Sequence, residues 1–367
     1  MKTSRLKVDK PFLIISVILM VVGFFIFNSA SLALLAKENS NYADIAFSQM
    51  VLGLFGGTVA MIWALRQDFK IWKKLAFYLL IVAIILNILV LFPGIGFEHN
   101  GARRWIRILG ISFQTSEILK LAFVLYFAAW VSRIGEKIKT FRQGFLPLLI
   151  LFTISAVLLL LQPDTDNFLL IIIAGMAMFI AAGGLWRHIF VIILTGVIGI
   201  TMLYFTQDYI RARINTFFDP QADAQGASFQ VQQSLIAIGS GGLFGRGFGQ
   251  SVQKFTYLPE PVGDSVFAVA AEEFGFVGSI FLLVIFILFA TRGLKIASET
   301  ENIFARLTVV GIVIMIVFQA FVNIGAMLGV IPLSGITLPF VSQGGTSLFI
   351  TLLEVGIVLS ISKSRGL

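Results

Sequence analysis

The sequence predicts an all-α, polytopic membrane protein with about ten transmembrane helices in a single domain over residues 1–367. Hydrophobic residues make up 58% of the chain and charged residues only 13%, whereas the surface of a soluble domain needs far more charge. About ten apolar runs are long enough to cross a bilayer. Cysteine is absent and there are two histidines, which excludes disulfides, thiol catalysis and thiolate metal sites.

The predicted helices follow one another with mostly short connections. The first apolar run is too long for a signal-peptide core and lacks a convincing small-residue cleavage site, so we interpret it as a retained span. The spans are expected at residues 11–36, 45–65, 75–92, 116–132, 145–162, 167–184, 187–206, 264–291, 304–330 and 346–362.

One connection is much longer than the others and covers residues 207–263, between helices seven and eight. Long structured loops tend to be functional. Within this loop, residues 228–238 place glutamines between apolar residues, which predicts a short helix in the membrane interface. A segment that only caps the bundle would have the same pattern.

Lysine and arginine orient the bundle. The two ends of the chain and alternate connections hold 18 of the 27 basic residues, so this side is predicted to be cytoplasmic, with both termini on it. The net charge of +8 reflects this topology and contact with anionic lipid, and no nucleic-acid partner is expected. The extracytoplasmic side carries, against this trend, Arg103, Arg104, Arg107, Arg211, Arg213, Arg246 and Lys254.

Asp264 stands where the long polar loop enters the eighth apolar run, with Glu272 and Glu273 about two turns deeper. Carboxylates are costly there unless they are paired or functional. A helix N-terminus favours an ionised carboxylate, so Asp264 could act as an outward-facing base. An N-cap is the alternative, and the local pattern alone favours it. Glu272 and Glu273 point to different sides of the helix, so at most one of them would line a cavity at Asp264. Glu272 is the candidate, because it is closer to Asp264 in angle around the helix axis.

Residues 239–249 combine many glycines with Arg246. Glycine lets backbone amides approach an anion closely, so a phosphate-cradling loop is one interpretation. The pattern is neither a Rossmann nor a P-loop signature. Flexible packing is therefore the favoured interpretation of this motif taken alone.

Several motifs together resemble the shape, elongation, division and sporulation (SEDS) family. They lie at residues 101–105, 112–120, 240–250, 257–261 and 332–347, together with Asp264. The resemblance covers almost the whole chain. The residues after Asp264 and residues 345–348 are more similar to the cell-division branch, FtsW, than to the elongation branch, RodA.

The resemblance implies a ten-helix peptidoglycan glycosyltransferase that joins lipid II units at the outer face of the bacterial cytoplasmic membrane. It implies a class B penicillin-binding protein, a transpeptidase, and other divisome or elongasome membrane proteins as partners. It also implies that Asp264 is catalytic. The C-terminal motif would add four substrate-binding residues, Ser342, Gln343, Gly344 and Gly345.

Two positions depart from the usual family pattern. Val262 and Gly263 precede Asp264, where the family usually has His-Thr or His-Ser, so a mechanism that needs an imidazole at this place is in doubt. Gln343 stands where the family usually has tyrosine, which keeps hydrogen-bonding capacity but loses a stacking face.

The chemistry of the implied reaction assigns roles to the outer residues. Making a β-1,4 bond from an α-linked sugar diphosphate inverts the anomeric carbon, so it needs a base for the acceptor hydroxyl and cations for the leaving diphosphate. Asp264 has the charge and position of the base. Phospholipid headgroups are an alternative ligand for the cationic candidates, which are Arg103, Arg104, Arg246 and Lys254.

Three further candidates have two interpretations each. Trp105 is either an interfacial anchor or a platform for a sugar. Glu117 and Lys120 lie on one face of the fourth span; a buried ion pair is the leading interpretation, and holding the cavity or the diphosphate is the second. No cofactor is evident, and no ligand spacing demands a resident metal. Mg²⁺ or Mn²⁺ could still be bound through the diphosphate.

Two other classes of function remain open. A lipid II flippase would use charges inside the membrane, and Glu117, Lys120 and Glu354 fit that. A noncatalytic division scaffold would not need Asp264. The chain has no nucleotide-binding motif, which disfavours ATP-driven transport.

Overall fold

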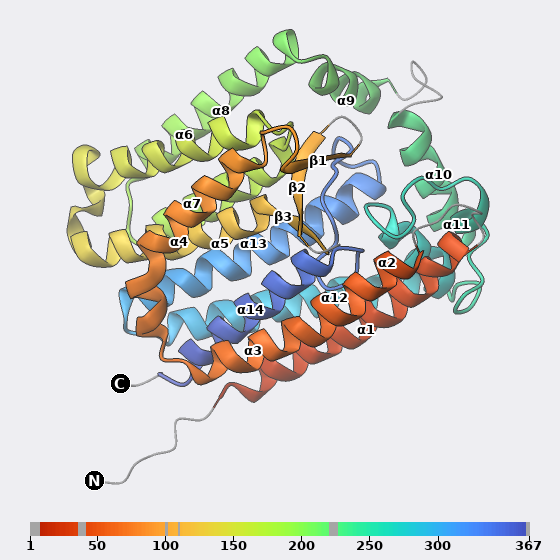
Figure 1. The fold of residues 1–367 in the computed structure, drawn as a ribbon, viewed down its shortest axis with the longest axis horizontal. Helices are drawn as coiled ribbons and strands as arrows, with labels where there is room; N and C mark the ends of the chain where they lie inside the picture. The colour runs from red at the N-terminus through yellow and green to blue at the C-terminus, as the bar shows by residue number, and fades with distance from the viewer. Residues whose placement is uncertain (1–7, 36–41, 100–101, 109–110, 220–226, 365–367) are drawn as a thin grey trace.

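The computed structural model describes residues 8–35, 42–99, 102–108, 111–219 and 227–364. Long, roughly parallel helices form one bundle (Figure 1). Within the described residues, nine helices are long and apolar enough to cross a membrane. They are α1 (Lys10–Leu35), α2 to α3 (Ile45–Arg66), α4 (Phe69–Leu89), α5 with its 3-10 turn η2 (Thr115–Lys139), η3 with α6 (Phe141–Leu160), α8 (Trp186–Thr206), α12 (Val266–Ser298), α13 (Ile303–Met327) and α14 (Gly345–Ser362).

The predicted helices are present, with most bounds within a few residues; the largest differences are the start of α4 at Phe69 (predicted 75) and the end of α12 at Ser298 (predicted 291). The sixth predicted span is α7 (Thr165–Ala181), which has 17 residues. The second span begins as α2 (Tyr42–Phe47), continues as the π-helix η1 (Ser48–Gly56) and ends as α3 (Gly57–Arg66). Asp9 N donates to Ser362 Oγ at 3.1 Å, so α1 begins beside the end of α14.

Helices α13 and α14 form the centre of the bundle. In the most apolar 18-residue stretch of each helix, 78% of the residues are buried in α13 and 89% in α14, but only 11% in α8. α13 packs against α5, α7 and α12, and α14 packs against α3. All these helices are apolar, so their contacts with one another determine which are central and which are peripheral.

A small antiparallel sheet, which the all-α prediction did not include, lies in the connection between α4 and α5. Its strands are β1 (Gly96–His99), β2 (Ala102–Ile108) and β3 (Ile111–Gln114), in the order β1-β2-β3. Trp105 pairs with Phe97 on one side and with Gln114 on the other. β3 leads directly into α5, so the sheet fixes β2 and its arginines above the bundle.

The long connection between α8 and α12 contains further helices. It contains α9 (Asp208–Phe218), α10 (Ala227–Ser240) and the short α11 (Gln253–Thr256). The helix predicted at residues 228–238 is confirmed by α10, while α9 was not predicted. Residues 220–226 of this loop lie outside the described residues.

Helix α12 is broken at Gly275, whose backbone has φ 66° and ψ −164°. The glycine-rich segment docks into the break and bonds the backbone groups that the helix leaves free. The four hydrogen bonds are Arg246 N to Glu272 O (3.0 Å), Gly247 N to Glu273 O (3.0 Å), Phe276 N to Gly242 O (2.9 Å) and Val277 N to Leu243 O (3.1 Å). Non-helical backbone at membrane depth is tolerated where protein satisfies it in this way.

The glycines of this segment are required by close backbone approach. A Cβ at Gly245 would lie 2.1 Å from Glu273 O, and one at Gly241 would lie 2.2 Å from Ala271 O. Gly245 also has a φ of 79°, which side chains disfavour. The segment is therefore a packing motif, as the sequence alone favoured, and the phosphate-cradling interpretation is wrong for these amides.

Candidate active site

Asp264 lies in the turn before α12, partly buried at the end of the bundle that carries the long connection 207–263. The N-cap of α12 is Ser265, so the N-cap interpretation of Asp264 is wrong. Asn323 Nδ2 on α13 donates to Asp264 O at 2.8 Å and to Ile336 O at 2.7 Å. The side-chain amide of one central helix therefore holds Asp264 against the segment that joins α13 to α14.

That joining segment also braces the turn from the other side. Ser342 Oγ donates to Gly263 O at 2.8 Å, and Gln343 N donates to Val262 O at 2.8 Å. Gly344 N donates to the Gln49 side chain at 2.9 Å. A Cβ at Gly345 would lie 2.4 Å from Ser48 O. Ser342 and Gln343 therefore contact the turn that carries Asp264, whereas Gly344 and Gly345 pack against η1.

Charged side chains surround the Asp264 carboxylate. Burial and the neighbouring carboxylates of Glu260 and Asp166 raise the pKa of Asp264, while Arg213 and Arg104 lower it, with a resulting value of about 7. Burial disfavours the ionised form of a carboxyl, and nearby like charges do the same. Asp264 therefore changes its charge near neutral pH.

Arg213 and Asp166 were not selected from the sequence, yet both lie at the site. A Cβ built on Gly335 would be 3.7 Å from Arg213 Nη2, 3.7 Å from Asp264 Oδ2 and 3.8 Å from Asp166 Oδ2. Arg213 pairs with Asp166 at 3.0 Å. Two features of the sequence could have pointed to them: the predicted extracytoplasmic position of Arg213, and the position of Asp166 in the tight turn after the fifth predicted span.

Arg104 lies at the edge of the same cluster. Its guanidinium donates to Gln162 O at 3.1 Å and to Pro163 O, and it lies 3.8 Å from the Asp164 carboxylate. Arg103, in contrast, pairs with Glu98 at 2.8 Å on the surface of the sheet. Trp105, the next residue of β2, pairs with Gln114 of β3 and is partly buried. Of the two adjacent arginines, Arg104 is thus the one that faces Asp264.

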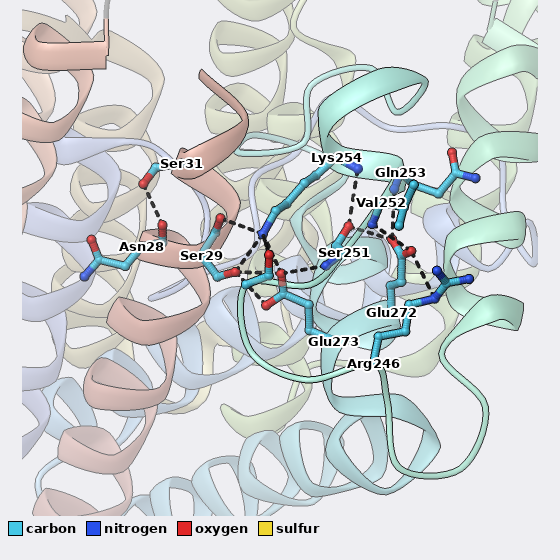
Figure 2. Close-up of polar contacts among 11 residues, drawn as sticks. Asn28, Ser29, Ser31, Arg246, Ser251, Val252, Gln253, Lys254, Glu272 and Glu273 are labelled. Atoms are coloured by element: carbon cyan, nitrogen blue, oxygen red, sulfur yellow. Dashed lines mark hydrogen bonds and ion pairs between the residues drawn. The ribbon is translucent and has the colours of Figure 1, made fainter. Parts of the chain in front are cut away.

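Lys254 was predicted to be a cation available to the leaving diphosphate, but its side chain is engaged inside the protein. Its ammonium group is fully buried and pairs with Glu273 at 2.7 Å. It also donates to Ser29 O (3.1 Å), Ser29 Oγ (3.0 Å) and Gly249 O (3.1 Å). Figure 2 shows Lys254, Glu273 and Ser29 pointing toward one another between α1 and α12. Because its donors are used inside the protein, Lys254 is not available to bind a diphosphate.

Arg246 and Glu272 form the other half of this cluster (Figure 2). Arg246 Nε lies 3.5 Å from Glu272 Oε1. The Glu272 carboxylate accepts from Ser251 Oγ at 2.6 Å and from Val252 N at 3.0 Å. Glu272 and Glu273 do face different sides, but both hold the outer loop, so the expectation that Glu272 lines the Asp264 site is wrong. Arg246 likewise faces Glu272 rather than Asp264.

Glu117 and Lys120 form the buried ion pair that was the leading interpretation, at 3.0 Å. Lys120 also donates to Gln319 Oε1 at 2.9 Å, and Gln319 Nε2 donates to Thr337 O at 3.0 Å. The pair thus lies below the segment that joins α13 to α14 and supports it from inside the bundle.

Two further features bear on ligands. Asn323 Oδ1 and Ser334 Oγ, next to the Asp264 turn and Gly335, are buried and have no hydrogen-bond partner among the described residues. Such groups mark places where a ligand or water can bind. No group of three or more His, Cys, Asp or Glu side chains that could hold a metal occurs in the described part of the chain.

Comparison with known proteins covers nearly the whole chain. Residues 10–366 match the family model of FtsW, RodA and SpoVE, described as a cell cycle protein. Stage V sporulation protein E of Bacillus subtilis (strain 168) is 36% identical over 363 residues, which is 99% of each chain. The probable peptidoglycan glycosyltransferase FtsW of Geobacter sp. (strain M18) is 37% identical over 359 residues, which is 98% of each chain.

Solved structures have the same fold. A chain from a peptidoglycan synthase complex, studied for the coordination of polymerization and crosslinking, superposes with a TM-score of 0.80 and 28% identity, covering 98% of each chain. The rod shape determining protein RodA of Thermus thermophilus gives a TM-score of 0.71 and 27% identity, again over 98% of each chain.

Proposed function

Because the chain belongs to the FtsW, RodA and SpoVE family, we propose that it is a peptidoglycan glycosyltransferase that polymerises lipid II at the outer face of the bacterial cytoplasmic membrane. Relatives over almost the full length carry this activity in their names. The observation that carries the proposal is the Asp264 carboxylate, which lies with arginines at one end of a membrane bundle and has a pKa of about 7.

In the proposed reaction Asp264 is the general base. It takes the proton of the acceptor hydroxyl as the acceptor oxygen bonds to the anomeric carbon of the donor. The bond from that carbon to the diphosphate breaks, and the diphosphate leaves with the electron pair. A base with a pKa near the working pH combines a useful ionised fraction with enough basicity. The single displacement inverts the anomeric carbon and needs no covalent enzyme intermediate.

Arg104 and Arg213 are the cations nearest to Asp264 and would face the leaving diphosphate. Each already has an acidic partner, Asp164 and Asp166 respectively, so their positive charge is partly neutralised. We therefore propose that Mg²⁺ or Mn²⁺ accompanies the diphosphate of the substrate. Polymer yield should fall when the cation is removed with EDTA and return when Mg²⁺ or Mn²⁺ is added; full activity in EDTA would reject this step.

We also propose a class B penicillin-binding protein, a transpeptidase, as the partner. The likeness to a chain of a peptidoglycan synthase complex supports this. Both termini would be cytoplasmic and Asp264 extracytoplasmic, which agrees with the even number of predicted spans and with the basic connections.

The test is to incubate the purified protein and its cognate transpeptidase with labelled lipid II. We expect muramidase-sensitive polymer from the wild type and none from Asp264→Asn, because an amide cannot accept the proton. The variant should still fold and bind the partner. Polymerisation by Asp264→Asn at the wild-type rate would reject the base assignment. Movement of lipid II across vesicles without polymer would favour a flippase, and neither activity would favour a scaffold.

A further inference from the structure

Asp166 joins three parts of the chain beside Asp264. It lies in the first turn of α7, and its carboxylate accepts two hydrogen bonds from Arg213 Nη1, at 3.2 and 3.0 Å. The same carboxylate accepts the backbone N–H of Gly335 at 3.0 Å. Asp166 thereby ties α9 of the outer loop to the segment between α13 and α14.

The Asp264 carboxylate lies at the same meeting point. The position of a Cβ on Gly335 is within 3.8 Å of side-chain atoms of Asp166, Arg213 and Asp264. The ion pair of Arg213, however, is with Asp166. Asp166 therefore determines where the guanidinium sits relative to the catalytic carboxylate, and it adds a second negative charge there.

We propose that Asp166 is a positioning residue for Asp264, and that the Asp166–Arg213 pair sets the electrostatic environment in which Asp264 gains and loses its proton. This inference rests on the proposed function, since it concerns the base of that reaction. Asp166 is not expected to touch the substrate's reacting atoms; it acts through Arg213, Gly335 and its own charge.

The two members of the pair act on Asp264 in opposite directions. The charged groups that face Asp264 are Glu260 on its own loop, Asp166 on α7, Arg213 on α9 and Arg104 on β2. The two acids raise the pKa of Asp264 and the two arginines lower it. Removing Asp166 deletes a repulsion and frees the charge of Arg213, so both effects make Asp264 more acidic. Removing Arg213 has the opposite result.

The experiment measures polymer formation as a function of pH for Asp166→Asn and Arg213→Gln in complex with the transpeptidase. The midpoint of the acidic limb should fall by about half a pH unit or more in Asp166→Asn, as Coulomb's law predicts for a neighbouring charge. It should rise by a similar amount in Arg213→Gln. The double variant should lie between them. Arg213→Lys, which keeps the charge, should stay near the wild type.

Asp208→Asn is the matched control. It makes the same change of charge on the helix that carries Arg213, but its side chain is 99% exposed and pairs with Arg211 at 3.5 Å. We expect no shift of the midpoint. An equal shift in Asp208→Asn and Asp166→Asn would show a diffuse surface effect and reject the proposal.

The outcomes separate this inference from the proposed function. If the wild type makes no polymer, the proposed function fails. If the wild type polymerises but Asp166→Asn and Arg213→Gln both keep its midpoint, only the role of Asp166 fails. A purely structural role would lower the yield at every pH without moving the midpoint. If Asp166→Asn does not fold, the shift in Arg213→Gln decides the question alone.

Discussion

Asp264 combines partial burial with a charge that the proposed reaction requires. In the folded chain its pKa is raised from 3.8 to about 7. A carboxyl with a raised folded pKa contributes stability that is present below its unfolded pKa and is lost as pH rises toward the folded value. The ionised base is thus available for catalysis only in the pH range in which it also destabilises the fold.

Asp264→Asn should therefore become progressively more stable than the wild type as pH rises from about 4 to about 7, and the difference should stay constant above pH 7. The measurement is the midpoint of thermal unfolding of both proteins in detergent between pH 4 and pH 8. Parallel curves over this range would mean that Asp264 has an ordinary pKa.

Lys254 illustrates a residue whose role changes between sequence and structure. As a supposed headgroup ligand it should tolerate arginine, but its ammonium group has four hydrogen-bond acceptors inside the protein. We expect Lys254→Met to lower the free energy of unfolding by about 3–5 kcal/mol, because it leaves Glu273 as an unpaired buried charge. Adding Glu273→Gln should recover part of the loss.

The control for this prediction is Lys295→Met. Lys295 forms an exposed pair with Glu299 at 3.8 Å, and exposed pairs contribute at most about 1 kcal/mol. Thermal unfolding of the three variants in one detergent makes the comparison. A loss for Lys254→Met no larger than for Lys295→Met would contradict a buried ion pair.

At the scale of single residues, the sequence identified Asp264 and Arg104 but not Asp166 or Arg213. Asp264 is conspicuous because it stands at the start of an apolar run and within a family motif, and Arg104 because it opposes the charge bias of the topology and also lies in a family motif. Asp166 and Arg213 are 47 positions apart, and their pairing depends on α9, whose mostly polar sequence has no span-like pattern. Long-range ion pairs have no local signal.

At the scale of elements, apolar periodicity predicted each long helix because lipid selects for uninterrupted apolar runs. It could not reveal the break in α12, since glycine is common in unbroken membrane helices. Nor did it reveal the sheet, because strands of four to seven residues lie in a connection between two strong helical signals. Both features are set by contacts with distant segments.

The docking of the glycine-rich segment into α12 can be tested with one methyl group. Gly245→Ala would bring its Cβ to 2.1 Å from Glu273 O at a φ of 79°, so it should displace the segment and lower the unfolding temperature. Gly239→Ala is the control, since a Cβ there meets nothing within 4 Å and alanine favours the helix.

Proteolysis of the outer loop in the folded protein measures the displacement directly. We expect Gly245→Ala to be cut faster than the wild type and Gly239→Ala to be cut no faster. Equal resistance of the two variants would mean that the segment can leave the break without consequence.

At the scale of the whole molecule, the charge pattern predicts which end of the bundle faces outside. Because the chain has no cysteine, single cysteines can report this. The sequence nominates Gln225 for the outer side, which lies outside the described residues, and Lys137 for the inner side. The structure adds Asp208, whose side chain is 99% exposed.

An impermeant thiol reagent should label Gln225→Cys and Asp208→Cys in intact spheroplasts, and Lys137→Cys only after permeabilisation. Lys137 is exposed, so failure to label it before permeabilisation reports the membrane and not burial. Labelling of Lys137→Cys in intact spheroplasts would invert the topology and put Asp264 in the cytoplasm.

The broken helix also constrains how the chain is made. The segment that fills the break, residues 241–247, is synthesised before α12 and must cross the membrane before its docking site exists. The part of α12 after the break, residues 276–298, forms about 35 Å of helix, which is enough to span the roughly 30 Å hydrocarbon core. Insertion can therefore begin with that part, whose charged residues, Arg292 and Lys295, lie near its far end. Glu272 and Glu273 then need to be desolvated only when Lys254 and Arg246 dock against them. Assembly of the outer end would then be a late, cooperative step of biogenesis.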